Sequence, residues 1–84
     1  MDNKQLLIKK IKDSNLSISV AESCTGGQLS SAFVSEAGAS DFFSGGVVTY
    51  STESKVKILK IDSKKIDSYG VVSQEIAIEM SVKV

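Results

Sequence analysis

The sequence predicts an α/β fold built on parallel strands, and two patterns carry this prediction. Leu16, Ile18 and Val20 alternate with serines, which is the period of two expected of a strand with one buried face. Residues 45–50 (GGVVTY) form a second β-branched segment, and residues 28–36 between the two segments repeat apolar side chains at helical spacing. Because a helix separates the two strands, they can pair in parallel with that helix as the crossover.

The first element in chain order is a helix that begins near residue 2. Asp2 is the expected N-cap, and Gln5 stands where its side chain completes a capping box. We expect a buried apolar stripe on this helix, formed by Leu7, Ile8 and Ile11. The strand at residues 16–20 follows.

The second helix, at residues 28–36, has Gly38 as its expected stop. Residues 39–41 then turn the chain into the second strand, at residues 45–50. Gly45 and Gly46 open that strand, and glycines in a strand indicate a bulge or a close backbone contact.

Helices dominate the remainder of the chain. Ser51 can cap a helix that runs to about residue 59. A short helical turn at residues 63–69 ends at Gly70, and Ser73 caps a final helix. One face of that helix collects Ile76, Ala77, Met80 and Val84.

Composition excludes several kinds of chemistry. The chain has no His, so neither a Ser-His-Asp triad nor a Cys-His pair can form within it. With a single Cys and no His, we expect no metal site, and the sequence indicates no cofactor.

Charge and hydropathy restrict the partners and the location. The basic and acidic residues balance at ten each, so no basic field favours nucleic acid as a partner. No apolar run approaches the roughly 18 residues needed to span a bilayer, and residues 1–13 are too polar for a secretory signal. We therefore expect a cytoplasmic protein with no membrane partner, and a single Cys fits a reducing compartment.

Residues 21–27 (AESCTGG) join the first strand to the second helix and are the most informative segment. Such a turn aims backbone N–H groups and the positive end of the helix dipole at a bound group, which favours developing negative charge there. Ser23 and Cys24 are the candidate nucleophiles. Without His, their proton must pass to a Lys, a carboxylate, a Tyr or a group outside this chain. The alternative is a tight turn in which Ser23 only caps the helix.

Several segments together resemble the CinA C-terminal domain family. They are residues 21–27, residues 45–51 (GGVVTYS), Glu53 with Lys55, and residues 69–75 (YGVVSQE), in matching order and spacing. The resemblance covers nearly the whole chain. It implies a three-layer α/β/α domain with a largely parallel sheet. It also implies an amidohydrolase that converts nicotinamide mononucleotide to nicotinate mononucleotide and ammonia.

The resemblance also implies the roles of individual residues. Ser23 resembles the family's catalytic serine, Lys55 the lysine that pairs with it, and Tyr50 an active-site tyrosine that hydrogen-bonds the lysine or stacks on the pyridine ring. Burial and the early helical position of Lys55 would both lower its pKa, which a base requires. The alternatives are that Ser23 is a helix cap, Lys55 a solvated charge and Tyr50 a half-buried strand aromatic.

The remaining site residues surround the turn. Thr25, Gly26 and Gly27 would supply backbone donors to an oxyanion or a phosphate. Glu22 either orients Lys55 or bonds backbone amides beside the turn. We expect Cys24 to be a small buried hydrophobe instead of the nucleophile, because neighbouring residues point in different directions. Around residue 70 we expect a helix stop and a helix cap.

The resemblance has departures, and it corresponds to the first half of the family's domain. Thr52 and Ser54 stand where the family usually has Asn and Ala, on a helix surface that tolerates them. A sheet of only two strands has unpaired edges. We also expect exposure of apolar residues on the last helix, Ile76, Met80 and Val84, and hence a homo-oligomer.

Two functions follow as expectations. The first is the amidohydrolase acting on a small-molecule nucleotide, with weak or no activity in residues 1–84 alone because ribose and phosphate contacts would be missing. The second is a non-catalytic nucleotide-binding or oligomerising module.

Overall fold

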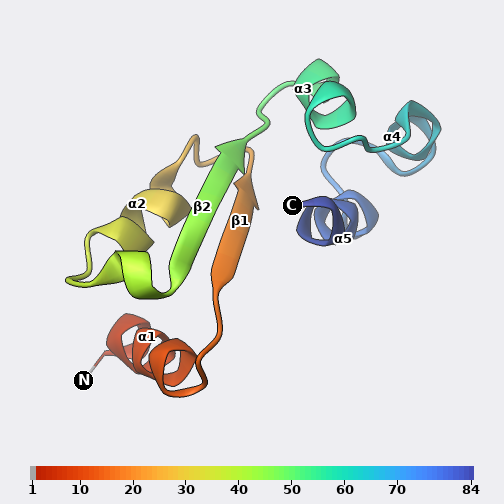
Figure 1. The fold of residues 1–84 in the computed structure, drawn as a ribbon. Coiled ribbons are helices and arrows are strands. Elements are labelled where there is room, and N and C mark those ends of the chain that lie inside the picture. Colours follow the sequence, from red (N-terminus) through yellow and green to blue (C-terminus); the bar gives the residue numbers. More distant parts are fainter. Residues whose placement is uncertain (1) are drawn as a thin grey trace.

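The computed structural model describes residues 2–84 as a mixed α/β structure with a two-stranded parallel sheet (Figure 1). The prediction of an α/β fold with parallel strands is confirmed. The elements in chain order are α1 (Asn3–Asp13), β1 (Ile18–Glu22), α2 (Gln28–Val34), the 3₁₀ turn η1 (Ala39–Asp41), β2 (Phe43–Val48), α3 (Thr52–Lys57), α4 (Ser63–Tyr69) and α5 (Gln74–Lys83).

Both strands lie about two residues from their predicted positions. β1 begins at Ile18 and continues to Glu22, whereas β2 begins at Phe43 and ends before Tyr50. Pairing sets these ends, because the Ile18 N–H group donates to the Phe42 carbonyl at 2.8 Å, while Leu16 lies outside the sheet and is exposed. Side-chain alternation alone does not report where a partner strand starts.

The glycines of β2 have the two properties expected of them. The register shifts between Ile18 and Ser19, so that Ser19 faces Gly45, whose φ of 152° marks the irregularity. A Cβ atom on Gly46 would lie 2.5 Å from the Ser30 hydroxyl oxygen, so α2 packs directly on the backbone there.

Helix ends follow the sequence closely. Asp2 and Gln5 form the predicted capping box of α1, and Ser51 and Ser73 cap α3 and α5 through their hydroxyl groups. Gly70 ends α4 as expected. Gly38 is displaced from its predicted role, because α2 already ends at Val34 and Gly38 instead begins the 3₁₀ turn.

One apolar cluster joins α1 and α2 to a face of the sheet, formed by Ile8, Val20, Phe33 and Phe42. Ile8 is buried and Ile11 packs against the cluster, but Leu7 is 50% exposed, contrary to the predicted stripe. Only a narrow face of α1 reaches the sheet, and Leu7 is rotated away from it.

A second cluster holds the three C-terminal helices together and contains Leu59, Ile61, Ile66, Ile76 and Met80. Ala21 and Val47 pack against it from the sheet. The expectation that Ile76 and Met80 would be exposed is therefore wrong, because α3 and α4 cover them, and only Val84 of that set is open to water, at 39%.

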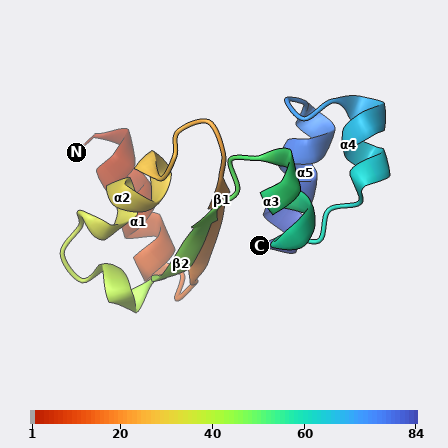
Figure 2. The same ribbon diagram turned by 90° about the horizontal axis from the view of Figure 1, so that it is seen from above.

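The two clusters lie on opposite sides of the sheet (Figure 2), with α1 and α2 on one side and α3, α4 and α5 on the other. The radius of gyration is 14.2 Å, against about 12 Å for a compact domain of this length. The structure is therefore elongated, with extents of 41 × 20 × 17 Å along its principal axes. No helix within residues 2–84 combines the length and the apolar character needed to cross a membrane.

Candidate active site

Ser23 and Lys55 meet where the two parallel strands end. Ser23 directly follows β1, and Lys55 lies in α3, which is the next element after β2. The Nζ atom of Lys55 is 2.9 Å from the Oγ atom of Ser23. This contact was expected from the sequence, and the parallel pairing explains it, because the carboxyl ends of parallel strands lie at the same sheet edge.

Lys55 is buried, not solvated. Only 1% of its surface is exposed. Besides Ser23, its amine donates to the carbonyl oxygens of Thr49 at 2.6 Å and Tyr50 at 3.2 Å. Within residues 2–84 no salt bridge involves this amine. Burial without a balancing carboxylate lowers the pKa of Lys55, because desolvation disfavours the ammonium form.

The three partners of the Lys55 amine fit both of its protonation states, since an ammonium can donate to all three. A neutral amine has two N–H groups and one lone pair. Two of the neighbouring atoms are carbonyl oxygens, which only accept, and the third is a hydroxyl, which can donate. The neutral amine can therefore donate to both carbonyls and accept the proton of Ser23, which is the arrangement of a general base.

Glu22 bonds the turn and α2 and not the lysine. One carboxylate oxygen accepts from the Thr25 hydroxyl at 2.8 Å and the Leu29 N–H group at 2.7 Å. The other accepts from the Ser30 N–H group at 2.9 Å and the Ser30 hydroxyl at 2.5 Å. These donors, above all the Ser30 hydroxyl, lower the pKa of Glu22 to about 2. Two roles were expected for Glu22, and the structure shows the second of them: Glu22 accepts hydrogen bonds from backbone amides and does not orient Lys55.

Two N–H groups in the first turn of α2 are therefore not available to an outside anion. The N–H groups of Leu29 and Ser30 already bind the Glu22 carboxylate. Gly26 is also occupied, because its N–H group donates to the Ser23 carbonyl at 3.1 Å. In the part of the chain that the structure describes, the N–H groups of Thr25 and Gly27 have no such acceptor. The N–H groups of Cys24 and Gln28 have none either within residues 2–84, so these four are the donors that the turn can offer to a bound group.

Tyr50 and Cys24 differ from their expected surroundings. Tyr50 follows β2 and is 70% exposed, and it contacts Lys55 through its carbonyl oxygen. Cys24 is exposed and not a buried hydrophobe. The turn swings outward directly after β1, so the side chain that follows Ser23 points to water.

Two residues of the site, Thr49 and Ser30, were not given a role from the sequence, and Gly46 was expected only to mark a bulge or a close backbone contact. Thr49 is fully buried, and its carbonyl accepts from Lys55 while its hydroxyl has no partner in residues 2–84. Ser30 and Gly46 pack against one another beneath Glu22. A signal for Gly46 existed, since a strand glycine indicates close approach, but Ser30 resembles any other helix serine.

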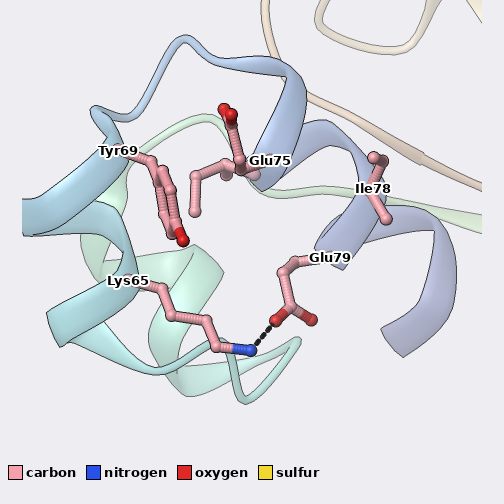
Figure 3. Close-up of a pocket in the computed structure, with 6 residues that line it drawn as sticks. Lys65, Tyr69, Glu75, Ile78 and Glu79 are labelled. Atoms are coloured by element: carbon pink, nitrogen blue, oxygen red, sulfur yellow. Dashed lines mark hydrogen bonds and ion pairs between the residues drawn. The ribbon is translucent and has the colours of Figure 1, made fainter.

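A separate hollow of about 250 Å³ lies between α4 and α5 (Figure 3). Lys65, Tyr69, Glu75 and Glu79 line it, and an ion pair joins Lys65 to Glu79. None of the predicted site residues reaches this hollow.

Comparisons with known proteins all point to one family. The profile of the CinA C-terminal domain matches residues 2–84. A CinA-like protein of Flavobacterium psychrophilum is 44% identical over 79 residues, which cover 94% of this chain and 19% of the relative. A CinA-like protein of Shewanella sediminis is 47% identical over 77 residues, which cover 92% of this chain and 18% of the relative. The chain thus spans about a fifth of these relatives.

Solved structures agree. The competence damage-inducible protein A of Klebsiella pneumoniae superposes with a TM-score of 0.92 at 30% identity, over 96% of this chain and 50% of that one. A CinA superfamily protein of Escherichia coli gives a TM-score of 0.91 at 32% identity, over 95% of this chain and 46% of that one. The chain spans about half the length of the solved proteins that it matches.

Proposed function

This chain belongs to the CinA C-terminal domain family, and we propose that it carries the nucleophile and the base of an amidohydrolase acting on nicotinamide mononucleotide. The products would be nicotinate mononucleotide and ammonia. The observation that carries the proposal is the 2.9 Å contact between the Ser23 hydroxyl and the buried Lys55 amine. A chain without His has few other ways to activate a serine.

The proposed reaction has two steps. In the first, neutral Lys55 takes the proton of Ser23 while Oγ attacks the carboxamide carbon. The tetrahedral intermediate then collapses, Lys55 returns the proton to the leaving nitrogen, and ammonia departs from an acyl-enzyme. In the second, Lys55 takes a proton from water, and the hydroxide attacks the ester. The second tetrahedral intermediate collapses while Lys55 returns its proton to Oγ, which restores the Ser23 hydroxyl and the neutral amine. The acid released ionises to nicotinate mononucleotide.

The backbone around the pair supports both steps. The carbonyls of Thr49 and Tyr50 hold the amine in place and stabilise the ammonium that forms after proton transfer. The N–H groups of Thr25 and Gly27 are among the candidate donors to the oxyanion. We propose that the ring of Tyr50, whose residue is 70% exposed, stacks on the pyridine ring of the substrate.

Binding of the ribose phosphate is proposed to depend on residues outside this chain. Within residues 21–30, Glu22 occupies the N–H groups of Leu29 and Ser30, and the matched solved proteins are about twice as long. Binding energy from remote parts of a substrate holds the reacting group in line with the nucleophile. We therefore propose weak turnover by residues 1–84 alone.

The test is release of nicotinate mononucleotide, separated from substrate by chromatography. It compares this chain with a chimera in which residues 1–84 replace the matching half of the Klebsiella pneumoniae relative's domain. We expect turnover by the chimera, its loss on Ser23→Ala, and little turnover by residues 1–84. An inactive, folded chimera would contradict the proposal.

The second candidate is a non-catalytic module that binds nucleotides or self-associates. It is favoured by exposed apolar side chains, with Val72 95% and Val82 71% exposed, and by a sheet of only two strands. Sedimentation equilibrium would show a homo-oligomer, and calorimetry would show nucleotide binding without turnover. A monomer that turns over substrate would exclude this candidate.

A further inference from the structure

We infer that Ser30 is a positioning residue for the Ser23–Lys55 pair and that it acts through Glu22. The inference rests on the proposed function of that pair. Ser30 does not contact the lysine or the nucleophile. It holds the carboxylate of the residue that immediately precedes the nucleophile.

Hydrogen bonds from Ser30 and its helix α2 hold the end of β1 in place. Glu22 is the last residue of β1, and its carboxylate accepts two hydrogen bonds from Ser30 and one from the Leu29 N–H group. The loop that carries Ser23 leaves β1 at Glu22 and enters α2 at Gln28. Both ends of that loop are therefore tied to one carboxylate, which restricts where Ser23 can lie.

Glu22 is also tied to the side that carries the lysine. Its carbonyl oxygen accepts from the Thr49 N–H group at 2.9 Å. The Thr49 carbonyl in turn accepts from the Lys55 amine at 2.6 Å. Glu22 thus connects to Ser23 through the chain and to Lys55 through Thr49, so movement of Glu22 changes the spacing of the pair.

The neighbouring strand leaves space for the Ser30 hydroxyl. A Cβ atom at position 46 would come within 2.5 Å of the Ser30 Oγ atom and 2.8 Å of the Val20 Cγ2 atom. Gly46 avoids both contacts, so α2 can approach the sheet closely enough for Ser30 to reach Glu22. The hydroxyl is thereby held between the helix, β1 and β2.

The consequence is chemical as well as structural. The reaction rate falls steeply when the nucleophile is displaced, and a displacement of about 1 Å can lower the rate on the order of a hundredfold. Ser30→Ala keeps the backbone donor and removes the hydroxyl donor. In this variant we expect the reactivity of Ser23 to fall by a factor of about ten or more. The dependence of that reactivity on Lys55 should weaken too, because the pair would no longer be held in contact.

The experiment uses residues 1–84 and does not depend on substrate. A serine-directed sulfonyl fluoride is reacted with the chain, and the rate of modification at Ser23 is followed by peptide mass spectrometry as a function of pH. The variants are Ser30→Ala, Ser30→Cys and Ser30→Thr. Ser31→Ala is the matched control, because Ser31 is the adjacent helix residue and is exposed.

We expect wild type to be modified at Ser23 with a rate that rises with pH as Lys55 loses its proton. Ser30→Ala should react about tenfold or more slowly with a flattened pH profile, Ser30→Thr should retain the wild-type profile, and Ser31→Ala should match wild type. Circular dichroism confirms the folded state, and Ser30→Cys replaces Ser30→Ala if the alanine variant does not fold.

Two results would overturn the inference, and they are distinguishable. A folded Ser30→Ala or Ser30→Cys chain with wild-type rate and pH profile would refute the role of Ser30 and leave the proposed function intact. A wild-type Ser23 that reacts no faster than exposed serines would refute the proposed function and the inference together.

Discussion

The amine of Lys55 lies 2.9 Å from the hydroxyl of Ser23 across 32 positions of sequence. The two residues follow different strands, and parallel pairing brings the ends of those strands together. Burial of the lysine then supplies the second requirement for a base, a lowered pKa. The contact and the burial are the two observations on which the proposed chemistry rests.

Ser23→Ala should abolish turnover in the chimera described above. The serine supplies the attacking oxygen, so we expect a loss on the order of a thousandfold or more. Cys24→Ala is the matched control, since Cys24 is adjacent and exposed, and its effect should stay within about twofold. Ammonia release measures both. The opposite pattern would make the thiol the nucleophile.

Lys55→Arg should also abolish turnover, although it keeps the positive charge. A guanidinium stays protonated and cannot accept the serine proton. In the wild type the rate should rise with pH, because only the neutral amine is a base, and the midpoint should lie below 10.5, the ordinary pKa of lysine. The measurement is kcat against pH. A Lys55→Arg variant that retains turnover would contradict the role of Lys55.

Glu22 should make the fold sensitive to acid. Its pKa is about 2 in the folded chain and about 4.5 without the structure, so its stabilising effect is complete above pH 4.5 and is lost as the pH falls toward 2. Urea unfolding at neutral and acidic pH measures this. Glu22→Gln should lower the stability at neutral pH and reduce its dependence on pH.

Glutamine has the shape of glutamate, but it should not replace the hydrogen bonds of Glu22, because both carboxylate oxygens accept from backbone N–H groups. The amide would direct its own donors at one of them. Asp67→Asn is the control, since Asp67 is an exposed carboxylate on α4. If the two variants unfold alike at every pH, the hydrogen bonds of Glu22 contribute nothing.

Gly46→Ala should lower the free energy of unfolding by about 1–3 kcal/mol. The cause would be steric, because the added methyl group meets the Ser30 hydroxyl oxygen at 2.5 Å. Chemical denaturation measures the change, with Ser44→Ala on the same strand as control. In a double-mutant cycle, Ser30→Ala should relieve part of the cost. Strict additivity would show that the two positions do not meet.

Local sequence was sufficient for features that involve near neighbours. The Asp2–Gln5 box, the Ser51 and Ser73 caps and the Gly70 stop each depend on residues three or four positions apart. Such contacts form wherever the chain turns helical, so their residue types reveal them. The ends of the strands were displaced, since pairing with a distant segment sets them.

The sequence by itself determined the α/β class, the parallel pairing and the turn at residues 21–27, and the absence of His left Lys as the natural base. Only the tertiary structure decided that Lys55 is 1% exposed, that Cys24 faces water and that Glu22 binds α2 and not the lysine. Burial and contacts across 32 positions arise from packing of separate elements. No local pattern of residue types encodes that packing, because the same pattern is compatible with several arrangements of neighbouring elements.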